Sequence, residues 1–186
     1  MMPELSLNIL DVTENSIKAD ANQIEIVVAI DNLEDTLSIQ IKDNGKGMSK
    51  EQLELVQDPF YTTRTTRRVG LGVPFLKQAA LGTGGTFEID SELGKGTKLE
   101  AIFKLSHIDR MPLGDITATI HALVVFNEGI RFLYTYQYDQ NQFTLDTEEF
   151  REILGDGVSF GEPAVSKFIQ EYLETNKSEV DGGLML

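Results

Sequence analysis

Two neighbouring segments of the sequence alternate apolar and polar residues, which indicates strands with one buried face. Within residues 23–31 and 36–43, the apolar residues at every second position are Ile24, Ile26, Val28 and Ile30, then Leu37, Ile39 and Ile41. The polar residues 31–35 between the two segments predict a hairpin turn. Because a sheet of this kind must bury its apolar face, the two strands require a second layer of structure.

Helical periodicity around these strands supplies that second layer. The further predicted elements are a helix over residues 3–21, a short helix over 49–57, a helix over 70–81 and a hairpin over 86–105. Ser49 is the expected N-cap of the short helix, and Pro74 falls in the first turn of the next helix, where proline is tolerated. The sequence therefore predicts an α+β fold, a two-layer α/β sandwich with helices on one face of a mixed sheet.

The sequence changes character after residue 106. Residues 107–186 carry 14 acidic and 5 basic residues, whereas residues 1–106 carry 16 acidic and 11 basic residues. We therefore divide the chain into a domain of residues 1–106 and a small acidic α+β module of residues 107–186. This module is expected to hold a helix, an aromatic hairpin, two helices and a frayed tail, near residues 113–123, 123–145, 146–154, 162–175 and 176–186.

Aromatic residues line one face of the predicted C-terminal hairpin, because all of them have even numbers: Phe132, Tyr134, Tyr136 and Tyr138. We expect this stripe to pack against the two C-terminal helices or against the main sheet. An interface with a second copy or a protein partner is the alternative. Nucleic-acid stacking is disfavoured, because the surrounding charge is negative.

Composition excludes several classes of function. The net charge of −14 repels nucleic acid and anionic membranes, and the lack of cysteine excludes disulfides, thiol catalysis and cysteine metal sites. Residues 1–10 lack the basic residues and the long apolar run of a signal peptide, and no apolar stretch reaches the length of a membrane span. The sequence therefore predicts a soluble, cytoplasmic protein without membrane insertion.

Residues 59–87 contain no Asp or Glu, although a stretch of this length should carry about five at this composition. Gly70 and Gly72 stand at the predicted start of a helix, where free backbone N–H groups and the helix dipole attract phosphate. A carboxylate near this helix end would repel such an anion, so the composition indicates a loop over a phosphate-bearing ligand. A basic loop without a ligand is the alternative. The basic residues of the stretch are Arg64, Arg67, Arg68 and Lys77.

Two further groups of polar residues fit a ligand of that kind. Asp11, Asn15 and Lys18 lie at positions i, i+4 and i+7 of the first predicted helix and share one face. Such a row can hold a water molecule, a magnesium ion and a phosphate oxygen, although a solvated helix face has the same pattern. Asp43 ends the second strand, in "DNGKG", whose glycines permit a sharp turn and a close ligand. A plain Asx turn is the alternative there.

Taken in order, these motifs resemble one known family. They are D-x-x-x-N on a first helix, "DNGKG" after a strand, "DPFYTT", "GLGVPF" at a helix start and "GKGT" in a closing hairpin. Roughly residues 5–105 are similar to the ATP-binding domain shared by histidine kinases, gyrase B, Hsp90 and MutL, the Bergerat fold. The likeness is closest to the histidine-kinase and anti-sigma branch.

The resemblance implies ATP and Mg²⁺ as cofactors and a role for individual residues. Asn15 would hold Mg²⁺ against the phosphates, Lys18 would reach a phosphate oxygen, and Asp43 would accept the adenine amino group. Residues 59–68 would form a lid over the nucleotide, and Thr97 would close the adenine end. The remaining implied ATP-binding residues are Gly45, Gly47, Met48, Phe60, Thr62, Thr63, Arg64, Arg67, Gly70, Leu71 and Gly72.

The chain departs from the family pattern at the position that activates water. The family usually places Glu four residues before the magnesium-binding Asn, whereas this chain has Asp11, one methylene shorter, with Glu14 beside Asn15. Asp11 and Glu14 are therefore the candidate catalytic residues. Because a misplacement of about 1 Å can lower a rate about a hundredfold, we expect slow hydrolysis unless Glu14 compensates.

The two histidines of the chain lie after the ATPase-like segment. His107 stands in "SHIDRMPL", which shares S-H-x-x-R-x-P-L with the phosphoacceptor pattern of histidine kinases. It is a candidate phosphoacceptor, and the alternative is a linker residue that caps or packs. His121 lies among apolar residues and is expected to belong to the core or to an interface.

The sequence thus predicts a kinase-like Mg·ATP-binding regulator that passes the γ-phosphate to a protein partner or to water. The alternative is a module that binds its partner according to ATP or ADP occupancy, without significant phosphotransfer. Nucleic acid is not expected as a partner. A homodimer is consistent with the resemblance, because the family often dimerises.

Overall fold

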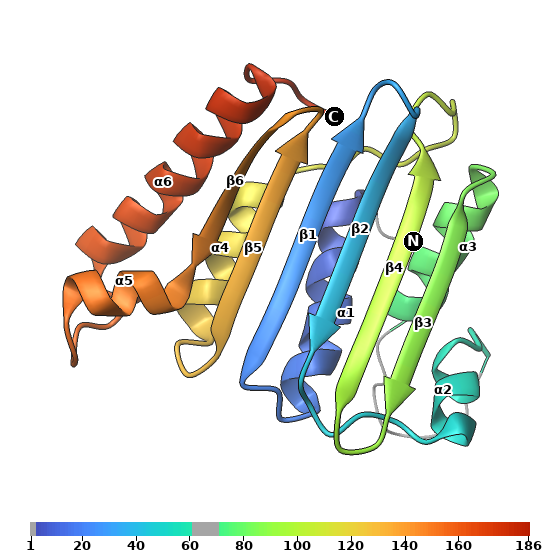
Figure 1. Ribbon diagram of the computed structural model, residues 1–186, viewed down its shortest axis with the longest axis horizontal. Helices are drawn as coiled ribbons and strands as arrows, with labels where there is room; N and C mark the ends of the chain where they lie inside the picture. The colour runs from blue at the N-terminus through green and yellow to red at the C-terminus, as the bar shows by residue number, and fades with distance from the viewer. Residues whose placement is uncertain (1–2, 61–70) are drawn as a thin grey trace.

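The computed structural model describes residues 3–60 and 71–186 of the chain. In this described part, strands form one six-stranded sheet in the order β3-β4-β2-β1-β5-β6 (Figure 1). The strands are β1 (Gln23–Asp31), β2 (Thr36–Asp43), β3 (Thr86–Glu92), β4 (Gly96–Lys104), β5 (Arg131–Tyr138) and β6 (Asn141–Asp146). The helices are α1 (Leu5–Lys18), α2 (Lys50–Val56), α3 (Gly72–Gly82), α4 (Ile116–Phe126), α5 (Thr147–Leu154) and α6 (Pro163–Asp181).

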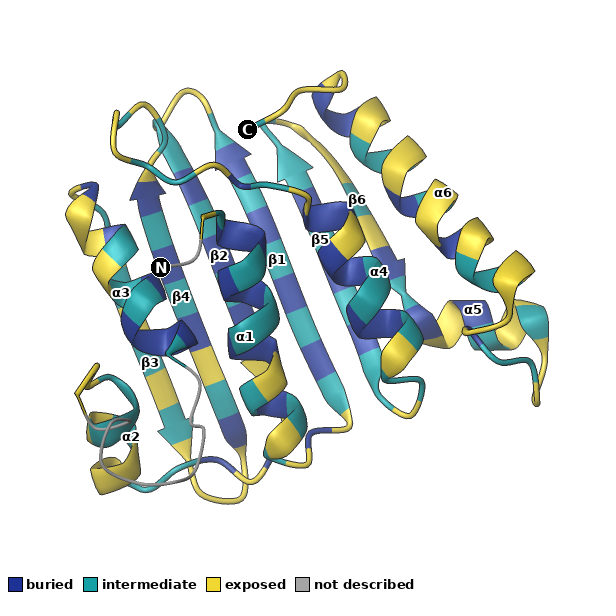
Figure 2. Ribbon diagram, turned by 180° about the vertical axis from the view of Figure 1, so that it is seen from behind, coloured by how far each residue is buried: buried dark blue, intermediate teal, exposed yellow. Residues whose placement is uncertain are grey.

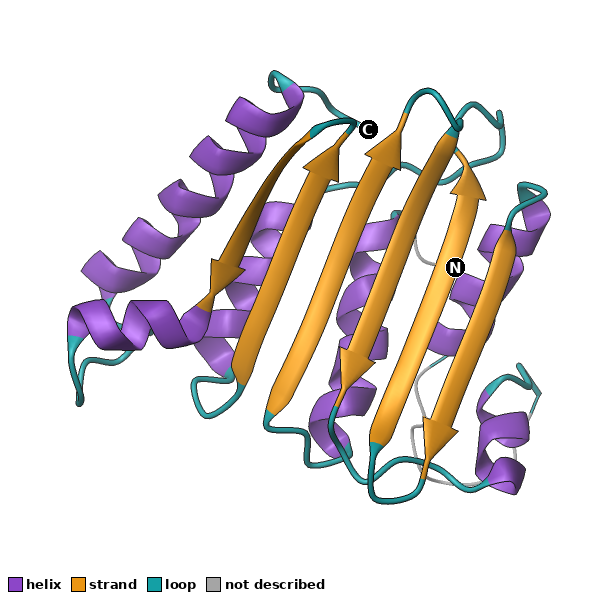
Figure 3. Cartoon of the chain, viewed as in Figure 1, coloured by secondary structure: helices purple, strands orange, loops and turns teal. Residues whose placement is uncertain are grey.

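The long helices cover one face of the sheet and leave the other face open, as the two layers in Figure 3 show. Seen from behind, α3, α1 and α4 lie side by side across the strands (Figure 2). Alternate residues of β1 reflect this arrangement, since Ile24, Ile26, Val28 and Ile30 are buried while the residues between them are only half-buried. The predicted α+β sandwich is confirmed.

Local sequence signals place the elements of the first half. The side chain of Ser49 accepts a hydrogen bond from the N–H of Gln52, whose own side chain accepts from the N–H of Ser49, so α2 begins with a capping box. Pro74 lies in the first turn of α3, where its missing N–H leaves no helical bond unmade. The strands of β1–β2 and of β3–β4 pair in an antiparallel manner, as the predicted hairpins require.

The C-terminal segment continues the same sheet. β5 pairs with β1 in parallel, from Gln23 opposite Arg131 to Ile30 opposite Tyr138, and β6 pairs with β5 in an antiparallel manner. The boundary predicted between residues 106 and 107 falls in the link from β4 to α4, and the sheet extends across it. This link is also tied to both ends of the chain, because Leu5 donates its N–H to the carbonyl of Pro112 and Leu113 donates to the carbonyl of Leu186.

The first part of the tail predicted to fray is helical, so the prediction is wrong for that part. α6 runs on to Asp181, where the sequence pattern placed its end near residue 175. The side chain of Asp181 is fully buried and accepts hydrogen bonds from Lys177 at 2.6 Å and from the Tyr136 hydroxyl at 2.9 Å. Lys177 and Asp181 therefore anchor α6 to β5 instead of facing solvent.

The aromatic stripe of β5 packs inward beneath the C-terminal helices. Phe132, Tyr134 and Tyr136 are at most 2% exposed. Phe143 of β6 contacts Tyr172 of α6 edge to face, with ring centroids 6.4 Å apart. The packing expectation is confirmed for these three residues, and their burial leaves them unavailable to a partner.

None of the described helices is both long enough and apolar enough to span a membrane.

Candidate functional site

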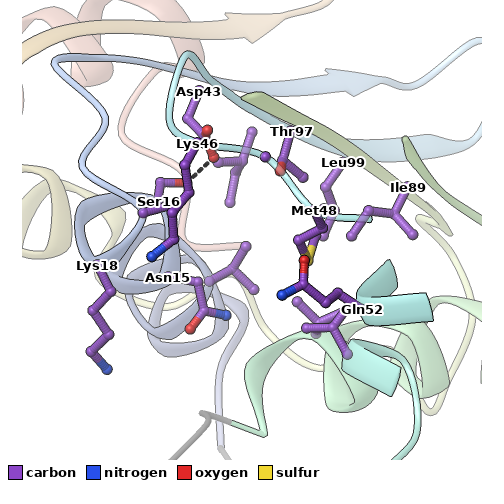
Figure 4. A pocket seen from close by; sticks show the side chains of 16 residues that line it. Asn15, Ser16, Lys18, Asp43, Lys46, Met48, Gln52, Ile89, Thr97 and Leu99 are labelled. Atoms are coloured by element: carbon purple, nitrogen blue, oxygen red, sulfur yellow. Dashed lines mark hydrogen bonds between the residues drawn. The ribbon is translucent and has the colours of Figure 1, made fainter. Parts of the chain in front are cut away.

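One pocket opens between the C-terminal half of α1, the end of β2, α2 and the β3–β4 hairpin (Figure 4). Its volume is about 410 Å³, within the usual range for small-molecule sites. Its apolar walls include Val12, Ile41, Val56, Val73, Ile89 and Leu99. Its polar and flexible lining residues include Asn15, Ser16, Lys18, Asp43, Lys46, Met48, Gln52 and Thr97.

Asp43 is the one carboxylate among the lining residues, and its side chain is held firmly. Its Oδ2 accepts a hydrogen bond from the Ser16 hydroxyl at 2.5 Å, and its Oδ1 accepts from the backbone N–H of Gly45 at 2.9 Å. The residue is 8% exposed. A nearly buried acceptor with a fixed orientation can select a ligand that presents an N–H donor.

The β3–β4 hairpin places a second polar group beside Asp43. Thr97 stands opposite Asp43 in the register of β4 with β2. Its hydroxyl lies 2.8 Å from the hydroxyl of Ser91, which also accepts from the N–H of Met48 at 2.9 Å. The hydrogen bonds therefore join β4, β3 and the loop after β2 into one wall of the pocket.

Gly45 and Gly47 are required by the packing of the chain itself. A Cβ on Gly45 would lie 2.7 Å from the carbonyl oxygen of Ala19, and one on Gly47 would lie 2.0 Å from the carbonyl oxygen of Glu92. Gly47 also has a φ of +68°, which favours glycine. The two glycines let the "DNGKG" loop lie directly against the end of α1 and the β3–β4 turn.

The row of polar residues on α1 divides between the pocket and the start of α3. Asn15 and Lys18 line the pocket, and the amide nitrogen of Asn15 is buried without a hydrogen-bond partner among the described residues. Asp11 faces α3, because a Cβ on Gly72 would lie 2.6 Å from its Oδ2. Glu14 points outward and pairs with Lys18 at 3.9 Å.

The start of α3 presents free donors to the same region. Its N-cap, Leu71, offers no side-chain hydrogen bond, and the first turn contains no acidic residue. Pro74 has no N–H, so the donors of this turn are the backbone groups of Gly72 and Val73. The positive end of the helix dipole adds to their attraction for an anion.

Part of the predicted site lies outside the described residues, namely Thr62, Thr63, Arg64, Arg67 and Gly70 with most of the lid. Phe60 is described, and its side chain is 78% exposed after the end of α2. Its N–H donates to the carboxylate of Asp58 at 2.8 Å. The roles assigned to these residues remain predictions.

The two histidines lie away from the pocket. β4 places Thr97 at the pocket end of the sheet and Lys104 at the other end, roughly 23 Å further along the strand. His107 follows Lys104, and its Nδ1 accepts the N–H of Asp109 at 3.1 Å. His121 contacts Ser166 through Nε2 and joins α4 to α6, as expected for a core or interface histidine.

Three polar lining residues escaped the sequence interpretation: Ser16, Lys46 and Gln52. Ser16 lies four residues after Val12, so its spacing in the sequence placed it on the buried face of the helix and did not mark it as a pocket residue. Lys46 sits between the two glycines of the "DNGKG" loop and brings a second cation to the pocket. Its position inside the "DNGKG" motif is the sequence signal that could have identified Lys46 as a pocket residue.

The matched family agrees with this geometry. Residues 3–107, more than half of the chain, match the family described as "Histidine kinase-, DNA gyrase B-, and HSP90-like ATPase". Sporulation kinase D of Bacillus subtilis is 30% identical over 98 residues, which are 53% of this chain and 19% of the kinase. The match spans no more than 24% of the length of the first eight curated relatives.

Two solved structures share the fold. The crystal structure of the N-terminal domain of a DNA repair protein matches with a TM-score of 0.59 and 18% identity, covering 84% of this chain and 58% of that one. The Aquifex aeolicus MutL ATPase domain complexed with ADP matches with a TM-score of 0.51 and 14% identity, covering 83% and 70%. The extent of both matches places part of the C-terminal segment in the shared fold.

Proposed function

Because this chain belongs to the family of histidine kinase-, DNA gyrase B- and HSP90-like ATPases, we propose that it binds Mg·ATP and passes the γ-phosphate to a protein partner. The observation that carries the proposal is the convergence of Asn15, Asp43 and Thr97 on one pocket from three separate elements. The adenine amino group donates to Asp43, whose carboxylate is already oriented by Ser16 and Gly45. The apolar walls of the pocket receive the purine ring.

The phosphates lie toward α1 and the start of α3. Lys18 and Lys46 bring positive charge to the pocket. The N–H groups of Gly72 and Val73 point out of the first turn of α3, and no acidic residue in that turn opposes an anion. The missing acids of residues 59–87 are explained by this role, since a carboxylate there would repel the phosphates.

Magnesium fits the site as an ion shared with the nucleotide. No group of three Asp, Glu, His or Cys side chains in the described part of the chain could hold a metal by itself. Mg²⁺ is commonly bound by one or two protein oxygens together with substrate phosphates. Asn15 supplies such an oxygen, and its amide nitrogen is buried without a partner in residues 3–60 and 71–186. When bound, the ion neutralises charge on the phosphates.

Asp11 favours transfer to a protein over fast hydrolysis. Its carboxylate is short and lies against Gly72, while Glu14 is exposed and lies 3.9 Å from Lys18. Because Asp11 is one methylene shorter than the glutamate of the family pattern, we expect it to orient a water molecule poorly. An acceptor side chain from a partner brings its own geometry and depends less on Asp11. His107 of the same copy is not a suitable acceptor, because it lies at the opposite end of the sheet.

The test follows the labelled γ-phosphate. The chain is purified with its bound proteins and incubated with γ-labelled ATP and Mg²⁺, beside Asn15→Ala and the exposed control Asn141→Ala. We expect label on a co-purified protein with the wild type and the control, little label in free phosphate, and none transferred by Asn15→Ala.

Two other results would change the conclusion. A partner that is retained by ATP and released by ADP, without acquiring label, would replace phosphotransfer with the nucleotide-gated binding module. Failure of the wild type to bind ATP would contradict both functions.

A further inference from the structure

Asn8 on α1 is a buried amide with neither of its polar atoms satisfied. The residue is 0% exposed, and both Oδ1 and Nδ2 lack a hydrogen-bond partner among the described residues. Buried polar groups are nearly always paired in folded proteins, and an unpaired one often marks a functional demand. No motif in the sequence singled out this position.

The helix places Asn8 on the flank that faces α3. Asn8, Asp11 and Asn15 stand at i, i+3 and i+7, and Asp11 lies against Gly72 of α3. The opposite flank faces α4, because the carbonyl of Ser6 accepts from Thr119. Thr13 lies one heptad beyond Ser6 on that second flank. Asn8 therefore belongs to the polar row that approaches the proposed phosphate site.

The position of Asp11 conflicts with the proposed position of the phosphates. Its carboxylate lies beside Gly72, at the helix end whose first N–H groups would receive a phosphate oxygen. Two anions at one helix end repel each other strongly in a site shielded from water. Either the carboxylate turns away when the nucleotide binds, or the nucleotide binds weakly.

We propose that Asn8 is a positioning residue that receives the Asp11 carboxylate when a nucleotide phosphate occupies the start of α3. Residues three apart on a helix are neighbours, so the Asn8 amide can donate to Asp11 after a change of rotamer. The Asn8 amide, which lacks an acceptor among the described residues of the nucleotide-free protein, then donates a charge-assisted hydrogen bond to Asp11 in the nucleotide-bound protein. This inference rests on the proposed function, since it requires phosphate at α3.

The proposal is tested with Asn8→Leu, which keeps a similar volume and removes the amide. Mg·ATP affinity is measured by calorimetry, and the melting temperature of the empty protein is measured in parallel. We expect Asn8→Leu to melt at or above the wild-type temperature, because it removes unsatisfied polar atoms. Its affinity for Mg·ATP should fall about tenfold or more, since a hydrogen bond to a charged group is lost.

A double-mutant cycle separates positioning from packing. In Asp11→Asn the repelled charge is absent, so adding Asn8→Leu should produce no further loss of affinity. Thr13→Val is the matched control, because Thr13 also has a buried hydroxyl without a partner in the described part of the chain, on the flank away from the phosphates. It should bind Mg·ATP as the wild type does. Asn8→Ala provides the same comparison if the leucine variant does not fold.

Three outcomes contradict the inference. Wild-type affinity in Asn8→Leu and Asn8→Ala would show that the amide does not act on the nucleotide. Losses that add in the double variant would show that Asn8 does not act through Asp11. A wild-type protein that binds no Mg·ATP would overturn the proposed function and this inference together, and so is distinguishable from the first two outcomes.

Discussion

Tyr134 and Tyr136 are neighbours on the buried face of β5, yet their hydroxyls differ. Tyr136 donates to Asp181 at 2.9 Å, whereas the hydroxyl of Tyr134 is buried without a hydrogen-bond partner among the described residues. Burial raises the pKa of both phenols, the charge of Asp181 adds to both rises, and the hydrogen bond with Asp181 raises the pKa of Tyr136 further. The two tyrosines thus allow a buried hydroxyl with a hydrogen bond to be compared with one that has none in the described part of the chain, on the same face of one strand.

We predict opposite consequences when each hydroxyl is removed. Tyr136→Phe should lower the free energy of unfolding by about 1–3 kcal/mol, because Asp181 loses a buried donor. Tyr134→Phe should be neutral or stabilising, since no hydrogen bond is lost. Urea denaturation of the two variants measures both values. Equal destabilisation would show that the Tyr134 hydroxyl has a partner, such as a buried water molecule.

At the residue scale, sequence motifs identified residues that line the pocket but missed a residue that supports one of them. Asn15, Asp43 and Thr97 were predicted, and the structure places all three on one pocket. Ser16 was missed because its bond to Asp43 joins residues 27 positions apart. No local pattern encodes such a contact, since a serine on a buried helix face is ordinary.

At the scale of elements, α6 is held to β5 by a buried ionic group. Burial alone would raise the pKa of Asp181, but hydrogen bonds from Lys177 and Tyr136 hold it below its ordinary value of 3.8. A carboxyl with a lowered folded-state pKa stabilises the fold above its unfolded pKa. That stabilisation is lost as the pH falls from the ordinary value through the lowered one.

We therefore predict that acid weakens the docking of α6. The free energy of unfolding of the wild type should decline as the pH is lowered below about 4, because protonation of Asp181 breaks its bond with Lys177. Asp181→Asn should be less stable at neutral pH and should show a shallower decline in acid. Chemical denaturation across this range measures both. If the stability of Asp181→Asn declined in acid as steeply as that of the exposed control Asp156→Asn, Asp181 would not be the cause of the acid sensitivity.

The same element shows where pattern alone is insufficient. The helix over residues 162–175 was predicted, but its last part contains Asn176, Lys177 and Ser178, which read as a polar tail. Lys177 is held in place because it donates to Asp181, one turn further along the helix, and because its ammonium group lies over the ring of Tyr136 in β5. Tertiary contacts with β5 therefore extend the helix, and local helix propensity does not predict such contacts.

At the scale of the whole molecule, the parallel pairing of β5 with β1 joins the two predicted parts. Both strands and the helices over them contribute to one cluster of buried apolar residues. The sequence could not indicate this pairing, since the two strands are about a hundred residues apart and a separate hairpin would satisfy the same alternation. We expect the two parts to depend on each other for stability, because they share one sheet and one cluster of buried apolar residues.

We predict a single cooperative unfolding transition. Four of the five tyrosines lie in residues 107–186, and the chain has no tryptophan, so tyrosine fluorescence reports mainly on the C-terminal segment. Far-ultraviolet circular dichroism reports on the whole chain. The two signals should change at the same urea concentration. Separate midpoints would instead support independent folding of residues 107–186.

The proposed function depends on Asp43 as the group that selects the nucleotide. Calorimetric titration with Mg·ATP tests this most directly, using the wild type, Asp43→Asn and the exposed control Asp90→Asn. We expect saturable binding by the wild type and the control, and affinity about 10 to 100 times weaker in Asp43→Asn, the loss of one hydrogen bond to a charged group. Absence of wild-type binding, or unchanged affinity in Asp43→Asn, would contradict the assignment of this pocket to ATP.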